Sequence, residues 1–271
     1  MLCWVDGRPD TQVSVSDRGL AYGDGLFETI AVKRGEPRLL MRHMARLGEG
    51  ARRLHLPLDL PALEQELLAF CTELGVGVAK LLVTRGDGLR GYAPAQPSTP
   101  RRILLGSPFP AYPPEHAERG VRLYPCVTRL AEQPLLAGLK HLNRLEQVLA
   151  RNEWHDPRYA EGVVCDVAGR VIEGVYSNLF LVRDGQLLTA DLSRCGVAGV
   201  MRAEILARAA GCGLAAQVRD IDYAELLAAD EVFLCNSLYG IWPVRELQGR
   251  DWPVGALTRK LQDNLRSLLD S

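Results

Sequence analysis

Four prolines fall within eight residues of the segment SPFPAYPPEHAE, residues 107–118. Proline fixes φ and lacks a backbone donor, so this run fits neither a helix interior nor a central strand. A chain of 271 residues is long enough to bury two hydrophobic cores. The sequence therefore predicts a small N-terminal domain over 1–106, a linker over 107–118 and a larger C-terminal domain over 119–271.

Periodicity and turn residues predict helices and strands in both parts, which is an α+β fold. Asp59 and Pro61 mark one helix start and Gly75 its end, whereas Asn143 and Glu146 form a capping box for another helix. We expect strands at 1–6, 26–34, 79–85, 101–107, 121–130 and 231–236, an antiparallel meander at 162–167, 170–175 and 178–183, and helices at 39–54, 59–75, 143–153, 200–210 and 255–269.

Composition argues against several classes of protein. Thirty-two basic and thirty-three acidic residues leave a net charge of -1, without a basic block for nucleic acid. No apolar run approaches the roughly 20 residues of a membrane span. Seven scattered cysteines and five histidines lack metal-ligand spacing. We expect a cytoplasmic protein with reduced thiols that binds no metal, nucleic acid or membrane.

Two residues stand in surroundings that suggest chemistry. Lys140 lies in an apolar segment three residues before the expected helix cap, where burial and the helix dipole both favour a neutral amine. Taken alone, most lysines in such loops are solvated. Glu173 lies on an apolar strand and must face water or have a dedicated partner, such as a cationic ring nitrogen.

Three further segments are ambiguous when read singly. GVAGVMRAEIL, from residue 196, is a glycine turn into a helix, whose free N–H groups can hold an anion. Arg46 adjoins the apolar stripe of its helix and points either into a site or into solvent. RGDGLRGY, residues 85–92, is either a plain surface loop or a loop that binds a carboxylate through arginine.

Read in chain order, these segments resemble the fold-type IV pyridoxal-phosphate family. This family contains branched-chain aminotransferases, D-amino-acid aminotransferases and aminodeoxychorismate lyases. The segments that carry the resemblance span nearly the whole chain: SDRGLAYGDGLFET, HMARL, RGDGLRGY, GLKHLNRLEQVLAR, VIEGVYSNLF, GVAGVMR and EVFLCNSLYGIWPV.

The resemblance implies a pyridoxal 5'-phosphate cofactor between the two domains and a homodimer in which a loop of the neighbouring subunit helps close each site. It makes Lys140 the Schiff-base lysine and general base and acid, and Glu173 the partner of the pyridine nitrogen. The other residues that it implicates are Arg46, Val200, Met201, Asn236 and Ser237 for the phosphate, and Arg144, Arg90 and Tyr92 for the substrate side.

Within this family, KHLNRLEQVL and CNSLYGIWPV are most similar to the aminodeoxychorismate lyases, and Met201 stands where branched-chain aminotransferases commonly have threonine. The resemblance therefore implies conversion of 4-amino-4-deoxychorismate to 4-aminobenzoate and pyruvate, a step of folate biosynthesis. The alternative is a branched-chain or D-amino-acid aminotransferase that uses the same site. A third reading is an interaction protein in which Lys140 and Glu173 are structural.

Overall fold

A computed structural model describes residues 2–270 of the chain. The chain forms two compact units: unit 1 contains the residues up to Pro110 and the segment Leu139–Asn143, and unit 2 contains Ala111–Gly138 and Arg144–Leu269. Lys140 thus belongs to unit 1, although the residues before and after its segment belong to unit 2. Over the described residues, no helix combines the length and the apolar character that crossing a membrane requires.

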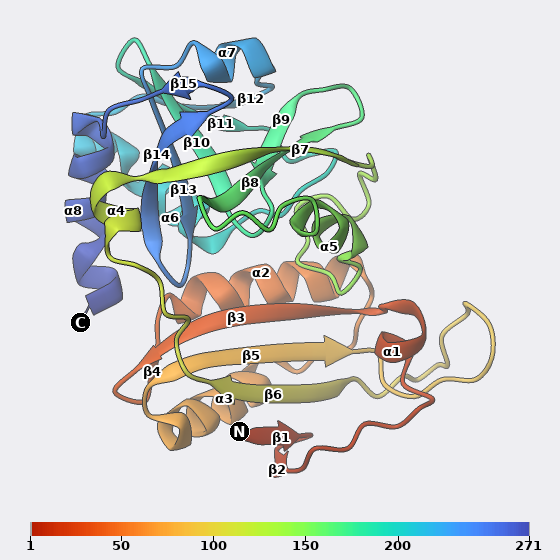
Figure 1. The fold of residues 1–271 in the computed structure, drawn as a ribbon. Helices are drawn as coiled ribbons and strands as arrows, with labels where there is room; N and C mark the ends of the chain where they lie inside the picture. The colour runs from red at the N-terminus through yellow and green to blue at the C-terminus, as the bar shows by residue number, and fades with distance from the viewer. Residues whose placement is uncertain (1, 271) are drawn as a thin grey trace. The chain divides into compact units, whose positions relative to one another are not determined.

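Unit 1 is built on a six-stranded antiparallel sheet in the order β2-β1-β6-β5-β3-β4 (Figure 1). On β3, Leu26, Glu28, Ile30 and Val32 alternate with residues of the opposite face, so Glu28 shares the face of three buried apolar side chains. The strands are β1 (Cys3–Val5), β2 (Arg8–Pro9), β3 (Gly25–Lys33), β4 (Glu36–Pro37), β5 (Gly77–Thr84) and β6 (Arg101–Ser107).

Three helices complete unit 1: α1 (Arg18–Tyr22), α2 (Leu40–Arg53) and α3 (Leu60–Leu74). Leu47 of α2 and Leu63 and Phe70 of α3 are almost fully buried in one core with the sheet. The start of α3 is as predicted, because the Asp59 carboxylate accepts a hydrogen bond from the Ala62 N–H at 3.0 Å. Such a cap satisfies a backbone donor that the helix itself leaves free.

Unit 2 contains a nine-stranded sheet in which β10 pairs with both β13 and β9, so that β10, β13, β14, β7, β8 and β9 close into a ring (Figure 1). The predicted meander is confirmed, since β8, β9 and β10 pair antiparallel. The strands are β7 (Val121–Leu130), β8 (Tyr159–Asp166), β9 (Val171–Gly174), β10 (Asn178–Arg183), β11 (Gln186–Ala190), β12 (Ala216–Arg219), β13 (Glu231–Asn236), β14 (Gly240–Leu247) and β15 (Arg250–Asp251).

The helices of unit 2 are α4 (Glu115–Arg119), α5 (Leu145–Arg151), α6 (Val200–Ala209), the 3-10 turn η1 (Ala210–Cys212), α7 (Tyr223–Leu227) and α8 (Ala256–Asp270). The predicted capping box of α5 is wrong. Arg144 occupies the N-cap position, the Asn143 side chain donates to the Gly23 carbonyl at 3.0 Å, and Glu146 accepts from the Ala131 N–H at 2.8 Å. Both polar side chains of the expected capping box thus form hydrogen bonds with residues outside α5.

Candidate active site

Lys140 lies in an extended segment that pairs with the first residues of β3. The Phe27 N–H donates to the Lys140 carbonyl at 2.9 Å, and the Leu142 N–H donates to the Gly25 carbonyl at 3.0 Å. The half-buried Lys140 side chain places its Nζ 4.4 Å from the centroid of the Phe27 ring. These contacts fix the backbone on both sides of the lysine and hold its amine over an aromatic face.

A buried charge cluster lies on the helix-covered face of β3. Glu28, which is 1% exposed, accepts from Arg46 Nε at 2.8 Å and from a second Arg46 nitrogen, and its Oε2 lies 2.6 Å from His43 Nδ1. Burial opposes the charge on Glu28, but the Arg46 charge and the hydrogen bonds from His43 and Arg46 outweigh it and lower its pKa to about 2. Burial lowers the pKa of His43. Glu28 is therefore ionised and orients the Arg46 guanidinium.

Glu173 lies on β9 and does not face solvent, because it is only 4% exposed. Its Oε2 accepts a hydrogen bond from the Val197 N–H at 2.8 Å and lies 3.5 Å from Asn178 Nδ2. Asn178 also donates to the Val197 carbonyl at 2.8 Å and accepts from the Gly199 N–H at 3.0 Å. One amide side chain therefore connects Glu173 to the segment that leads into α6.

Asn178 was not among the residues predicted for the site. The sequence contains a signal for it, since it is a polar residue at the start of the apolar strand NLFLVR. Its importance became visible only with the pairing of β9 and β10, in which Asn178 stands directly opposite Glu173.

The N-terminus of α6 has the features of an anion site. Gly199 occupies the N-cap without a capping side chain, and Val200 and Met201 form the first turn, where helix N–H groups have no partner within the helix. A Cβ on Gly199 would lie 2.0 Å from Asn178 Oδ1, and one on Gly196 would lie 3.3 Å from Glu173 Oε2. Glycine is thus required where the backbone approaches these side chains.

The remaining residues predicted in unit 2 lie at two turns. Asn236 ends β13, and its Oδ1 accepts from the Leu238 and Tyr239 N–H groups at 2.9 and 3.0 Å, which shapes the turn that contains Ser237. This turn adjoins Asn178, because Cys235 pairs with Asn178 across β13 and β10. Burial lowers the pKa of Arg144, whereas the negative charge of Glu173 favours its charged form.

Arg90 and Tyr92 lie in the loop after β5, and both are exposed, Tyr92 to 86%. Arg18 donates to the carbonyls of Gly91 and Tyr92 at 3.0 and 2.7 Å, and the Tyr22 and Tyr92 ring centroids are 5.5 Å apart. The loop is therefore docked against α1 through its backbone, and the side chain of Tyr92 remains accessible.

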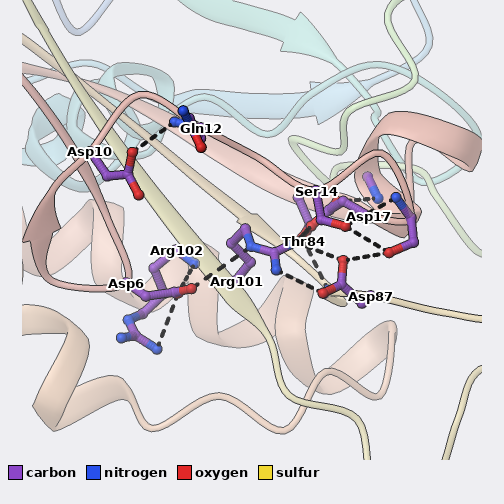
Figure 2. A network of polar contacts seen from close by, with 12 residues as sticks. Asp6, Asp10, Gln12, Ser14, Asp17, Thr84, Asp87, Arg101 and Arg102 are labelled. Atoms are coloured by element: carbon purple, nitrogen blue, oxygen red, sulfur yellow. Dashed lines mark hydrogen bonds and ion pairs between the residues drawn. The ribbon is translucent and has the colours of Figure 1, made fainter.

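The base of this loop is fixed by a polar network (Figure 2). Arg101 pairs with Asp17 and Asp87, the latter at 3.0 Å, and Thr84 Oγ1 donates to Asp17 at 2.8 Å. The hydrogen bond from Arg101 is the main cause that lowers the pKa of Asp87 to about 2. The network joins the ends of β5 and β6 to the segment before α1, so the loop leaves a rigid base.

Comparison with known proteins identifies the family to which this chain belongs. The chain belongs to the amino-transferase class IV family, because the sequence model of that family matches residues 25–247. It is 40% identical to the aminodeoxychorismate lyase of Vibrio harveyi over 270 residues, which are 97% of this chain and 99% of that protein.

Two further relatives delimit the similarity. A crystal structure of 4-amino-4-deoxychorismate lyase from Pseudomonas aeruginosa is 69% identical, with a TM-score of 0.98 and complete coverage of both chains. A putative branched-chain-amino-acid aminotransferase of Methanocaldococcus jannaschii is 31% identical, over 98% of this chain and 93% of that protein. The family is therefore established, and its members among these relatives include lyases and a putative aminotransferase.

Proposed function

We propose that this protein is a pyridoxal-phosphate-dependent lyase that converts 4-amino-4-deoxychorismate to 4-aminobenzoate and pyruvate. The observation that carries the proposal is the 69% identity, over the entire chain, to a solved 4-amino-4-deoxychorismate lyase. The chain's own residues supply the groups that this reaction needs. Lys140 provides an amine, Glu173 a buried carboxylate, and the start of α6 an anion site.

The residues fit pyridoxal 5'-phosphate. In unit 2, Val200 and Met201 present first-turn N–H groups suited to phosphate, and Gly196 and Gly199 keep the backbone there free of Cβ atoms. Glu173, buried and fixed by the Val197 N–H, suits a protonated ring nitrogen. We assign the phosphate to these N–H groups and to the turn of Asn236 and Ser237. Arg46 stays a predicted phosphate ligand.

Each residue then has a defined task. When bound, the cofactor supplies an electron sink for the carbon that carries the substrate amine. We propose that Lys140 would bind the cofactor through its amine and that, as general base, this amine would take the proton from C4 of the substrate. As general acid it would return a proton to the departing enolpyruvyl group, which leaves as pyruvate. The Glu173 carboxylate would hold the proton on the ring nitrogen. Loss of the enolpyruvyl group leaves an aromatic ring, which favours the products.

An aminotransferase is the second candidate, supported by the 31% identity to a putative branched-chain enzyme. Both reactions begin with the same proton removal by Lys140 and differ in where the proton returns. Met201, which is 1% exposed on the first turn of α6, stands where branched-chain aminotransferases commonly have threonine. If the protein is an aminotransferase, the residue roles stay the same, and only the substrate and the fate of the amino group change.

The role of Lys140 is tested by colour and by a matched lysine. Lys80 Nζ lies 5.5 Å from the same Phe27 ring but belongs to β5. We expect Lys140→Ala to lose the visible band of bound cofactor and Lys80→Ala to keep it. Borohydride reduction followed by peptide mass spectrometry should place the label on Lys140. Label on another lysine would contradict the assignment.

We further propose that the enzyme acts as a homodimer in the cytoplasm. Leu20, Leu89 and Tyr92 of unit 1 are 70%, 89% and 86% exposed. The loop of Leu89 and Tyr92 is docked on α1, the helix of Leu20, and exposed apolar side chains that gather in one place are typical of protein interfaces. All seven cysteines are free thiols, which suits a reducing compartment. Light scattering should give about twice the chain mass of 29.8 kDa. A monomer would contradict the dimer.

A further inference from the structure

A buried carboxylate that the proposed mechanism does not use lies beside the strand of Glu173. Glu161 is on β8 and fully buried. Its Oε1 accepts from the N–H groups of Gly162 and Val175 at 2.9 and 3.1 Å. Its Oε2 accepts from the Tyr176 N–H at 3.3 Å and from Ser177 Oγ at 2.8 Å. Four donors thus converge on one side chain.

Three of these donors belong to the turn 175–177, which joins β9 to β10. This turn begins two residues after Glu173 and ends immediately before Asn178. It is tightly built, because the Gly174 N–H donates to the Ser177 carbonyl at 2.8 Å and a Cβ on Gly174 would lie 2.2 Å from Ser177 Oγ. The conformation of the turn therefore sets how Glu173 and Asn178 face each other.

The side chains around Glu161 respond to its charge. Burial is the main cause that raises the pKa of four neighbouring groups, and the negative charge of Glu161 raises each pKa further; these groups are Tyr112, Tyr176, Tyr239 and Cys126. Burial raises the pKa of Glu161 to about 8, although the four hydrogen bonds favour its ionised form. A buried carboxyl of this kind is costly to keep, which indicates a task beyond packing.

We propose that Glu161 is a positioning residue that holds the turn 175–177, and through it keeps Glu173 and Asn178 in register at the start of α6. The inference rests on the proposed function, in which Glu173 contacts the ring nitrogen of the cofactor. Its action is indirect. Glu161 holds three consecutive residues through two backbone N–H groups and the Ser177 hydroxyl. The next residue, Asn178, holds both Val197 and Gly199.

The test variant is Glu161→Gln. The comparison is made above pH 8, where Glu161 is ionised and both of its oxygens accept. The amide oxygen of the glutamine can still accept from Gly162 and Val175, but its NH2 group faces the Tyr176 N–H, so that anchor of the turn is lost. We expect the Kd for pyridoxal 5'-phosphate to rise about three- to tenfold, in line with loss of one backbone hydrogen bond. The pH at which the visible band of the bound cofactor titrates should shift as well.

Glu231 offers a matched control in the same unit. It is buried on β13 and accepts from the Leu257 and Thr258 N–H groups at 3.1 and 2.8 Å and from Thr258 Oγ1 at 2.6 Å, at the start of α8. Glu231→Gln should lower the Tm but leave the Kd and the band unchanged. Equal effects of both variants on the Kd and the band would overturn the proposal.

Two further measurements separate positioning from general stability. In a Glu173→Gln background, Glu161→Gln should raise the Kd by a smaller factor than in the wild type, because part of its action passes through Glu173. Full additivity would overturn the proposal. Should Glu161→Gln fail to fold, Ser177→Ala can replace it, because it removes one donor of the turn and should raise the Kd about two- to threefold. An unchanged Kd of Ser177→Ala would overturn the proposal. Failure of the wild type to bind the cofactor would instead refute the proposed function.

Discussion

Replacing Asn178 by aspartate tests the contact between the amide and Glu173, because the substitution preserves shape and exchanges a donor for a charge. Asn178 Nδ2 lies 3.5 Å from Glu173 Oε2. Two carboxylates at that distance repel each other by about 5 kcal/mol at an effective dielectric constant of roughly 20. At 1.36 kcal/mol for each pH unit, the second of the two carboxyls would ionise about 3.5 pH units later than it otherwise would.

The assay is urea unfolding of the cofactor-free protein between pH 5 and pH 8. Asn178→Asp should already lose about 1.5 kcal/mol relative to the wild type at pH 5, where folding requires one carboxyl to take up a proton, and this loss should grow to about 5 kcal/mol by pH 8. Asn178→Ala, which removes the same hydrogen bonds without adding charge, should show a deficit that does not change with pH. The reasoning is refuted if both variants show the same pH-independent deficit.

Four more predictions concern the buried charges. Glu28→Gln should destabilise the protein by about 3 to 5 kcal/mol in urea unfolding, because it leaves the Arg46 charge buried without its partner. Arg46→Ala should instead let the cofactor be lost on dialysis, and full retention of the cofactor would count against a role of Arg46 in binding the phosphate. Glu173→Gln should slow turnover at least about 100-fold with the Tm nearly unchanged, so normal turnover would exclude its role. The pKa of Glu161 is raised to about 8 from an ordinary 4.5, so its protonated form adds stability that is fully present below pH 4.5 and is lost as the pH rises through 8. The unfolding free energy of the wild type should therefore fall relative to that of Glu161→Gln between pH 4.5 and pH 8. Parallel curves for the two proteins would contradict this prediction.

Local signals predicted those parts of the fold whose cause is local. Asp59 and Gly75 bound α3 as expected, because a cap and a left-handed glycine act within a few residues. The capping box at Asn143 and Glu146 failed because Gly23 and Ala131, both distant in sequence, take their side chains. Strand β14 was not predicted, and it forms through its pairing with β13 on one side and β7 on the other.

The site divides in the same way. Lys140 and Glu173 were candidates because of their apolar surroundings, and the resemblance to a known family supplied their roles, which remain predictions that the experiments above test. Glu28 follows an alternation with Leu26 and Ile30 that already placed it on the buried face, but its partner Arg46 lies on another element. The roles of Asn178 and Glu161 depend on which strands pair, and one sequence does not determine strand pairing.

The most direct test of the account supplies the purified, cofactor-loaded protein with 4-amino-4-deoxychorismate, without any keto acid, and measures pyruvate and 4-aminobenzoate together. The account predicts that the two products appear in equal amounts, and that Lys140→Ala abolishes both while Lys80→Ala does not. Absence of both products, with amino transfer from a branched-chain or D-amino acid to 2-oxoglutarate, would contradict the lyase and establish the aminotransferase.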